Sequence, residues 1–417
     1  MTRQPTFSPH EIPILSSPLD PSPLNHRLDR LTDYPFQRLT ALLGGAVTPD
    51  SIVMSIGEPQ HAPPLLVARI LAEQAAAWGK YPPGNGTADF RAASADWLGR
   101  RFGLPAGLVD PDRHILPVAG TREALYLFAQ AVCNPGDLVA MPNPFYQVYY
   151  GAAILAGGEP LLVPATAETG FQPDFESLGE DVLSRLALAY VCTPANPQGS
   201  VASSERLDRL VALARKHNFV LAVDECYSEI HDGIPPDSAL AACARADRAL
   251  IGGGQGLRNV VVFNSLSKRS SVPGLRSGFV CGDADLIAAF ARLRSYGGAA
   301  TPLPVLAAAA ALWRDEAHVE ESRALYRAKF DVAERLLGGR FGFTRPQGGF
   351  FLWLNVGDGE SAALALWQKA KLRVLPGAYL AQNDASGHNP GQPYIRVALV
   401  QDLPTTERAL SLLAQTL

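Results

Sequence analysis

A lysine flanked by hydroxyl groups and followed by an arginine is the clearest chemical feature of this sequence. Lys268 is one of only six lysines among 417 residues; it follows Ser265 and Ser267, and Arg276 lies eight positions later across a Pro-Gly pair. An unprotonated lysine amine can form an imine with a carbonyl compound, and the serines and the arginine fork would suit a phosphate. A surface lysine beside a turn is the alternative, and Arg276 argues against it.

Four other side chains could surround a flat ring with a basic nitrogen. Asp224 follows an apolar run, and its carboxylate could keep a ring nitrogen protonated, although an aspartate in this place is also a common helix N-cap. Tyr227 and Asn196 could donate hydrogen bonds to a ring oxygen, while a simple Asn-Pro turn is the alternative for Asn196. Tyr146 could stack on the ring, whereas core packing is the usual role of such aromatic clusters.

Backbone groups and a second arginine complete the candidate site. Gly120, Thr121 and Arg122 resemble the N-terminus of a helix, whose free backbone amides would suit a phosphate. A helix start that binds no ligand fits the local sequence equally well. Arg396 lies inside the strand-like run "YIRVAL" and must find an anion, either a substrate carboxylate or a structural acid. Gly57, in "IGEP", could bring its backbone close to the same ligand.

The elements that would position these residues alternate between strands and helices. The runs 186–199, 219–230 and 259–268 each end in turn residues, and a helical pattern with one apolar face lies at 203–217. Continuous apolar strands separated by helices predict a mostly parallel sheet covered on both sides. Ligands of such sheets bind beyond the carboxyl ends of the strands, where the motifs around Asn196, Asp224 and Lys268 are expected to meet.

Composition and charge exclude several classes of protein. The net charge of −4 and the absence of a basic run argue against a nucleic-acid or anionic-membrane partner. The apolar run 303–313 is too short to span a bilayer and predicts a buried helix. Five scattered cysteines and a start without signal-peptide character predict reduced thiols in the cytoplasm. No metal is expected, because the eight histidines show no ligand spacing, and the glycine-rich "IGGGQG" (251–256) lacks the ending of a P-loop.

The order of these motifs resembles that of the fold-type I pyridoxal-phosphate aminotransferases. An Asn-Pro-x-Gly turn, a strand ending in Asp-x-x-Tyr, and Ser-x-Ser-Lys with an arginine eight residues on occur here in that order, and the likeness extends from residue 24 to the end. It implies pyridoxal 5'-phosphate as cofactor, with Lys268, Asp224 and Tyr227 as the catalytic set. The residues implied to contact the cofactor are Gly120, Thr121, Arg122, Tyr146, Asn196, Asp224, Tyr227, Ser265, Ser267, Lys268, Arg276 and Tyr81. Those implied to contact the substrate are Gly57, Asn196 and Arg396.

The resemblance also implies a domain plan and an assembly. It implies an α/β fold with a large pyridoxal-phosphate domain over 61–300 and a small α/β domain made from both chain ends, 24–60 and 301–417. The proline-rich residues 1–23 are expected to form a separate arm. Tyr81 resembles the tyrosine that reaches the phosphate of the partner subunit, which implies a homodimer with shared active sites.

A narrower resemblance is to the bacterial succinyldiaminopimelate aminotransferases, and it is carried by residues 24–43, 264–279 and 374–399. It implies N-succinyl-LL-2,6-diaminopimelate and 2-oxoglutarate as substrates in lysine and diaminopimelate biosynthesis. An aspartate, aromatic or acetylornithine aminotransferase and a pyridoxal-phosphate β-lyase are the alternatives. A regulator with an aminotransferase-like domain would need a DNA-binding domain, for which 1–23 is too short. Candidates for binding the distal carboxylates of the substrate are Arg27, Arg30, Arg38 and Arg269.

Overall fold

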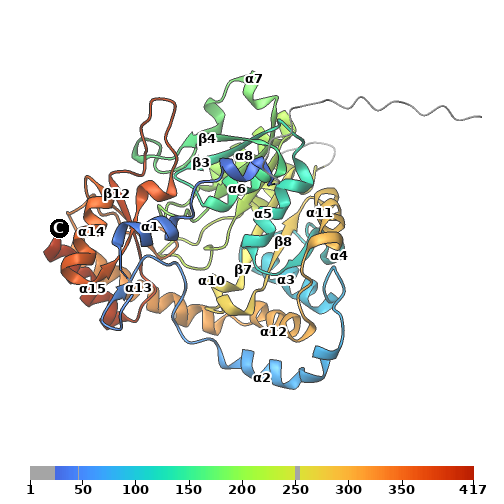
Figure 1. Cartoon of the computed structure of the whole chain (residues 1–417). Coiled ribbons are helices and arrows are strands. Elements are labelled where there is room, and N and C mark those ends of the chain that lie inside the picture. The colour runs from blue at the N-terminus through green and yellow to red at the C-terminus, as the bar shows by residue number, and fades with distance from the viewer. Residues whose placement is uncertain (1–23, 46, 249–253) are drawn as a thin grey trace, which may run out of the picture.

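A seven-stranded, mostly parallel sheet forms the centre of the chain in the computed structural model, which describes residues 24–45, 47–248 and 254–417 (Figure 1). The strand order is β2-β8-β7-β6-β5-β3-β4, and only β8 runs antiparallel to its neighbours. The strands are β2 (Ile115–Val118), β3 (Leu138–Asn143), β4 (Glu159–Pro164), β5 (Leu186–Cys192), β6 (Val220–Asp224), β7 (Val260–Ser265) and β8 (Gly278–Gly282). The predicted parallel sheet is confirmed.

Both faces of the central strands are buried, which explains why these strands are apolar except at their carboxyl ends. In β5, Leu188 and Tyr190 belong to the core on one face, and Ala189 and Val191 belong to the core on the other. One face is covered by α3 (Ala88–Phe102), α8 (Ser204–His217), α9 (Ala239–Arg248) and α12 (Leu303–Arg314). The other is covered by α5 (Thr121–Val132), α6 (Gln147–Ala156) and α11 (Ala284–Gly297). The helices predicted at 203–217 and 303–313 are therefore present as α8 and α12.

The carboxyl ends of the central strands meet at one edge of the sheet. Cys192 at the end of β5 is opposite Asp224 at the end of β6, and Asp224 is in turn opposite Phe263 of β7. Ser265 then ends β7, and the short helix α10 (Leu266–Arg269) follows at once. The sheet thus places three of the predicted motifs side by side.

A second, smaller core joins the two ends of the chain (Figure 1). Its sheets are β11-β12-β9 and the parallel pair β1-β10, in which Ile52 is opposite Leu372. The strands are β1 (Ile52–Val53), β9 (Phe351–Asn355), β10 (Leu372–Arg373), β11 (Leu375–Pro376) and β12 (Tyr394–Ala398). The helices packed around them are α1 (Pro35–Leu43), α13 (Ala317–Leu337), α14 (Gly359–Ala370) and α15 (Leu403–Thr416).

The division into 24–60, 61–300 and 301–417 remains our proposal for the domains. One element favours a later boundary, because α12 packs on α3 and α2 (Leu65–Glu73) in the core of the large sheet. The arm 1–23 and residues 251–253 of the glycine-rich stretch 251–256 lie outside the described residues. The short helices α4 (Pro111–His114) and α7 (Glu180–Leu183) complete the α-helices of the described part.

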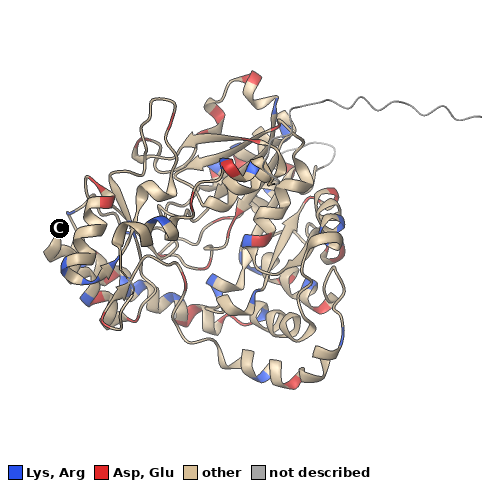
Figure 2. Cartoon of the chain, in the orientation of Figure 1, with Lys and Arg blue, Asp and Glu red and all other residues tan. Residues whose placement is uncertain are grey.

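Acidic and basic residues are intermixed over the elements, and the net charge of the chain is −4 (Figure 2). Within the described ranges, no helix has both the length and the apolar character needed to cross a membrane. All five cysteines are free thiols, and four of them are buried.

Candidate active site

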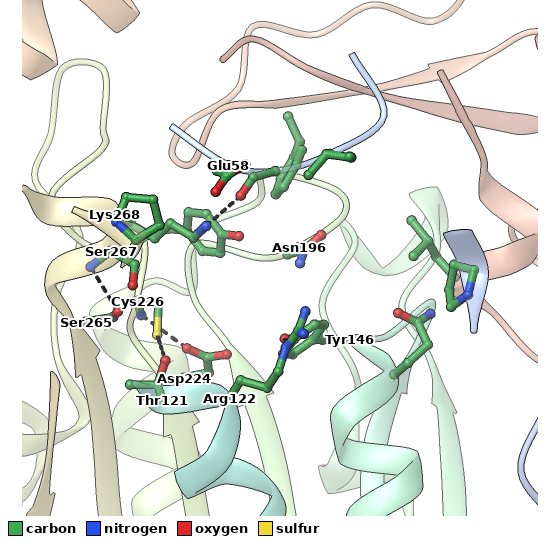
Figure 3. A pocket seen from close by; sticks show the side chains of 18 of the residues that line it. Glu58, Thr121, Arg122, Tyr146, Asn196, Asp224, Cys226, Ser265, Ser267 and Lys268 are labelled. Carbon is green, nitrogen blue, oxygen red and sulfur yellow. Dashed lines mark hydrogen bonds between the residues drawn. The ribbon is translucent and has the colours of Figure 1, made fainter. Parts of the chain in front are cut away.

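A cavity of about 460 Å³ lies at the carboxyl ends of β5, β6 and β7, between the large sheet and the smaller core. Lys268, Asp224, Asn196 and Tyr146 surround the same space (Figure 3). The cavity has the size usual for small-molecule and cofactor sites. The predicted residues that line it are Gly57, Thr121, Arg122, Tyr146, Asn196, Asp224, Tyr227, Ser265, Ser267, Lys268, Arg276 and Arg396.

The amine of Lys268 is directed into the cavity by α10, which starts immediately after β7. The Ser265 hydroxyl accepts from the Ser267 amide at 3.1 Å and so caps this short helix. Lys268 Nζ donates to the Gly57 carbonyl at 2.6 Å (Figure 3). Burial lowers the pKa of Lys268 to about 8. A substantial fraction of the amine is therefore neutral near pH 8, as a nucleophile requires.

Asp224 places its carboxylate at the floor of the cavity. The hydroxyl of Tyr149 donates to its Oδ2 at 2.7 Å, and the amide of Cys226 donates to its Oδ1 at 3.2 Å. No helix begins here, so the N-cap alternative is wrong. Burial raises the pKa of Asp224, and these hydrogen bonds oppose the shift. A buried carboxylate of this kind calls for a cationic partner.

The start of α5 and Arg276 form one anion-binding corner. Gly120 has φ of +86°, and a Cβ in its place would lie 2.1 Å from Nη2 of Arg276, so only glycine fits. Arg276 Nη1 donates to the Pro273 carbonyl at 2.8 Å. The Thr121 hydroxyl contacts Cys226 Sγ at 3.0 Å instead of capping the helix. The backbone amides of the first turn thus have no side-chain cap, which suits a phosphate. Gly120 itself is not among the residues that line the cavity.

Arg122 and two tyrosines form one wall of the cavity. Arg122 Nε donates to the Tyr146 hydroxyl at 2.7 Å, and Nη2 donates to the Tyr34 hydroxyl at 3.1 Å. Among the described residues no carboxylate lies within 4 Å of this guanidinium. Tyr146 therefore faces the cavity and is not solely a core residue. A cation with only hydroxyl partners is free to bind an additional anion.

Arg396 enters the cavity from β12 of the smaller core. Nη1 donates to Asn196 Oδ1 at 2.9 Å, Nη2 donates to the Ser55 carbonyl at 2.8 Å, and its guanidinium carbon lies 4.3 Å from the centre of the Phe351 ring. Burial lowers the pKa of Arg396 to about 10, so the group stays charged at neutral pH. In the described part of the chain it has no carboxylate partner within 4 Å, and its Nε has no hydrogen bond. A structural acid is therefore not its anion.

The other arginines proposed for distal carboxylates do not line the cavity. Arg269 is buried and pairs with Glu316 at 2.7 Å. Arg30 pairs with Glu159 at 2.6 Å. Arg38 stacks on a tyrosine ring of the smaller core, and Arg27 packs against the chain after α6. None of these four side chains therefore lines the cavity, although Arg269 adjoins Lys268 in sequence and the other three belong to the 24–43 segment.

Tyr81 also lies outside the cavity of its own chain and is fully exposed. Sequence reasoning missed several lining residues, of which Glu58 adjoins the predicted Gly57 and could have been found from it. Ile56, Gln147 and Cys226 likewise adjoin predicted residues, and most of the others come together through the tertiary fold. The missed lining residues are Tyr34, Pro35, Phe36, Ile56, Glu58, Gln147, Cys226, Pro273, Phe351, Leu375 and Leu380.

Comparison with known proteins agrees with this geometry. Residues 49–410 match the family described as aminotransferase class I and II. An LL-diaminopimelate aminotransferase of Desulforudis audaxviator is 32% identical over 396 residues, which cover 92% of this chain and 95% of that protein. The crystal structure of an aminotransferase from Neisseria meningitidis is 41% identical, with a TM-score of 0.87 over 94% of this chain and 99% of that one. A probable N-succinyldiaminopimelate aminotransferase from Thermus thermophilus is 25% identical, with a TM-score of 0.80 over 92% of this chain and 100% of that one. Since the family match spans most of its length, this chain belongs to the class I and II aminotransferases.

Proposed function

We propose that this aminotransferase moves the amino group of N-succinyl-LL-2,6-diaminopimelate to 2-oxoglutarate in lysine and diaminopimelate biosynthesis, which we place in the cytoplasm. The observation that carries the proposal is that two arginines line the cavity in addition to Arg276, which belongs to the anion-binding corner. Arg396 suits the α-carboxylate of an amino acid, and Arg122, whose partners are the hydroxyls of Tyr146 and Tyr34, suits a further carboxylate. The resemblance of three segments of the chain to succinyldiaminopimelate aminotransferases supports the same substrate.

Free LL-diaminopimelate is the second candidate. A relative 32% identical to this chain is named LL-diaminopimelate aminotransferase. The unacylated substrate carries a distal ammonium that the succinylated form lacks, and the carboxylate of Glu58 lines the cavity and is not engaged in an ion pair within the described chain. Glu58 could take that ammonium, since opposite charges attract strongly in a partly enclosed site.

Members of this family use pyridoxal 5'-phosphate, and the residues of the cavity fit that cofactor. Asp224 is a buried carboxylate without a cationic partner within 4 Å in the described chain, as a protonated ring nitrogen would require. The glycine at position 120 leaves room for Arg276 beside uncapped helix amides, as a phosphate would require. The residues that would hold the phosphate are Gly120, Thr121, Ser265, Ser267 and Arg276, with Tyr81 of a partner chain. Arg122 would contribute only its backbone amide in the first turn of α5, which leaves its side chain for the substrate.

The chain's own groups have distinct roles in this proposal. The cofactor, when bound, supplies an aldehyde and an electron-withdrawing ring. Lys268 would hold the aldehyde carbon in the resting enzyme and, when displaced by the substrate amine, move a proton from the substrate α-carbon. Its pKa of about 8 suits a group that must both accept and return a proton near neutrality. Asp224 would keep the ring nitrogen protonated, while Asn196 and Tyr227 orient the ring oxygen and Tyr146 lies against the ring.

The substrate is tested by comparing kcat/KM values with 2-oxoglutarate as acceptor. We expect N-succinyl-LL-2,6-diaminopimelate to exceed LL-2,6-diaminopimelate, aspartate, tyrosine and N-acetylornithine. Arg122→Gln should lower kcat/KM for the succinylated substrate by about ten- to a hundredfold, because one charge-assisted contact contributes about 1.5–3 kcal/mol, and should leave alanine as donor within about twofold. A clear preference for free LL-diaminopimelate would establish the second candidate, and a wide preference for aspartate or tyrosine would refute both.

A β-lyase would use the same cofactor residues but expel a group from the substrate Cβ. The two arginines Arg396 and Arg122, which both line the cavity, instead favour a substrate that carries more than one carboxylate. Transamination to 2-oxoglutarate forms glutamate, whereas β-elimination from a cysteine conjugate releases pyruvate. Measuring both products therefore distinguishes the two reactions. We expect glutamate formation to dominate.

We further propose a homodimer in which Tyr81 of each chain completes the site of its partner. The support is that Tyr81 is fully exposed in its own chain, and that the apolar side chains of Leu65 and Trp78 are also exposed. Mixing Lys268→Ala chains with Tyr81→Ala chains should restore activity above that of either variant alone, because one site in each mixed dimer would be intact. No gain on mixing, or a fully active monomer in sedimentation, would contradict shared sites.

A further inference from the structure

A second buried lysine lies in the smaller core, close to the segment that contacts Lys268. Lys329 on α13 is only 1% exposed. Its Nζ forms a 2.7 Å hydrogen bond with Nε2 of His61 and donates to the Leu399 carbonyl at 3.2 Å. No carboxylate of the described chain lies within 4 Å, and Asp402 acts on it only from farther away. Burial of an ammonium without a close counter-ion lowers stability, so a role other than stabilising the core is expected.

The histidine in this pair is held in one protonation state. Burial, and then the charge of Lys329, lower the pKa of His61 to about 4, so the ring is neutral at physiological pH. Its Nε2 must therefore accept from Lys329, which leaves the proton on Nδ1, 3.4 Å from the Ser322 hydroxyl. The ring also packs on Tyr326, with centroids 4.6 Å apart. Lys329 and the face of Tyr326 together fix the position of His61.

His61 ends the short segment that carries the Gly57 carbonyl over the cavity. That carbonyl accepts from Lys268 Nζ at 2.6 Å. On the opposite side, Gly57 packs so closely on two rings that a Cβ would lie 2.6 Å from Phe351 Cζ and 3.3 Å from Phe350 Cε2. The segment is thus held by the two phenylalanines at one end and by the Lys329–His61 pair at the other. Loss of the pair would free one end and allow the carbonyl to move away from Lys268.

We propose that Lys329 and His61 are positioning residues, which hold the Gly57 carbonyl against the amine of Lys268 during proton transfer. The inference rests on the role proposed above for Lys268. Neither side chain lines the active-site cavity, so both act through the backbone of 57–61. Packing alone does not explain a lysine at position 329. A methionine would fill a similar volume there without burying a charge.

The test uses four full-length variants, Lys329→Met, His61→Phe, His61→Gln and the surface control Lys369→Met. His61→Phe keeps the ring on Tyr326 but removes the acceptor, whereas His61→Gln keeps an acceptor for Lys329. For each holoenzyme we would measure the unfolding temperature, kcat and KM. For each chain freed of cofactor we would measure how the rate of recombination with pyridoxal 5'-phosphate depends on pH, which reports the pKa of Lys268.

Lys329→Met and His61→Phe should each lower kcat about tenfold, with KM within about twofold and no fall in unfolding temperature for Lys329→Met. The recombination profile of both should shift about one unit below that of wild type, because the Lys268 ammonium loses an acceptor. His61→Gln and Lys369→Met should behave as wild type.

An unchanged kcat and an unchanged recombination profile in both Lys329→Met and His61→Phe would overturn the inference. The inference would also be overturned if kcat fell as far in His61→Gln, which keeps the acceptor, as in His61→Phe, which removes it. If Lys329→Met failed to fold, the two His61 variants alone would decide. If wild type itself failed to bind the cofactor covalently, the proposed role of Lys268 would be refuted, which is a different result.

Discussion

Replacing Lys268 by alanine is expected to lower transamination by about a thousandfold or more while leaving the fold intact. Proton transfer by a positioned side chain contributes about 10²–10⁴-fold, and the same amine is proposed to hold the cofactor. Within the described residues its Nζ makes one hydrogen bond, to the Gly57 carbonyl, so little structure depends on it. Glutamate formation and thermal unfolding of the variant would be measured together.

The matched control is Lys216→Ala, which removes a lysine that is paired with Glu180 on the surface. This variant should keep the activity of wild type, since an exposed pair contributes about 0–1 kcal/mol to stability. A Lys268→Ala enzyme with ordinary turnover would refute the assignment of the reactive lysine. If Lys268→Ala lost activity and folded protein to the same extent, Lys268→Arg would separate the two causes. Arginine keeps the positive charge but cannot form the imine at neutral pH.

Replacing Arg396 by alanine is expected to lower kcat/KM by roughly 30- to 5,000-fold, which corresponds to about 2–5 kcal/mol for truncating one partner of a buried charge pair. The guanidinium is buried, charged and without a carboxylate partner in the described chain, so the substrate α-carboxylate would be its anion. The loss should appear with both the amino donor and 2-oxoglutarate, because each carries an α-carboxylate. Steady-state kinetics with each substrate varied in turn would measure it.

A donor amine without an α-carboxylate is the control for this prediction. Its kcat/KM should be low in wild type and change by less than about threefold in Arg396→Ala, since it makes no ion pair to lose. Arg396 also donates to Asn196 and Ser55, so unfolding temperatures would be compared as well. An equal loss for donors with and without the carboxylate would indicate a structural role and contradict carboxylate binding.

The large sheet and its edge could be predicted from sequence because local patterns determine them. Strands buried on both faces must be apolar throughout, and parallel strands place their carboxyl ends together. Asp224 is the last residue of β6, and Lys268 lies three residues after the last residue of β7. The end of each strand therefore fixes the place of each side chain. The prediction of these positions therefore needed no knowledge of tertiary contacts.

The arginine proposed to bind the distal carboxylate of the substrate could not be predicted in this way. Arg269 adjoins Lys268 in sequence, but successive helical residues point about 100° apart. The Arg269 guanidinium accordingly lies in the core, 5.5 Å from the ring of Trp97 and 5.2 Å from that of Trp313. Arg122 reaches the cavity beside Tyr34, a contact between segments 88 residues apart that no local spacing indicates. Long-range packing, and not residue type, selects which arginine faces the ligand.

The central claim is that Lys268 is the residue that binds pyridoxal 5'-phosphate covalently. Treating the full-length holoenzyme with borohydride would fix the cofactor on its lysine, and mass spectrometry of the peptides would locate the label. The chain offers six lysines, at positions 80, 216, 268, 329, 369 and 371. We predict a single pyridoxyl group on Lys268, with loss of the visible absorbance. A label on any of the other five, or no label on a protein saturated with cofactor, would contradict this account.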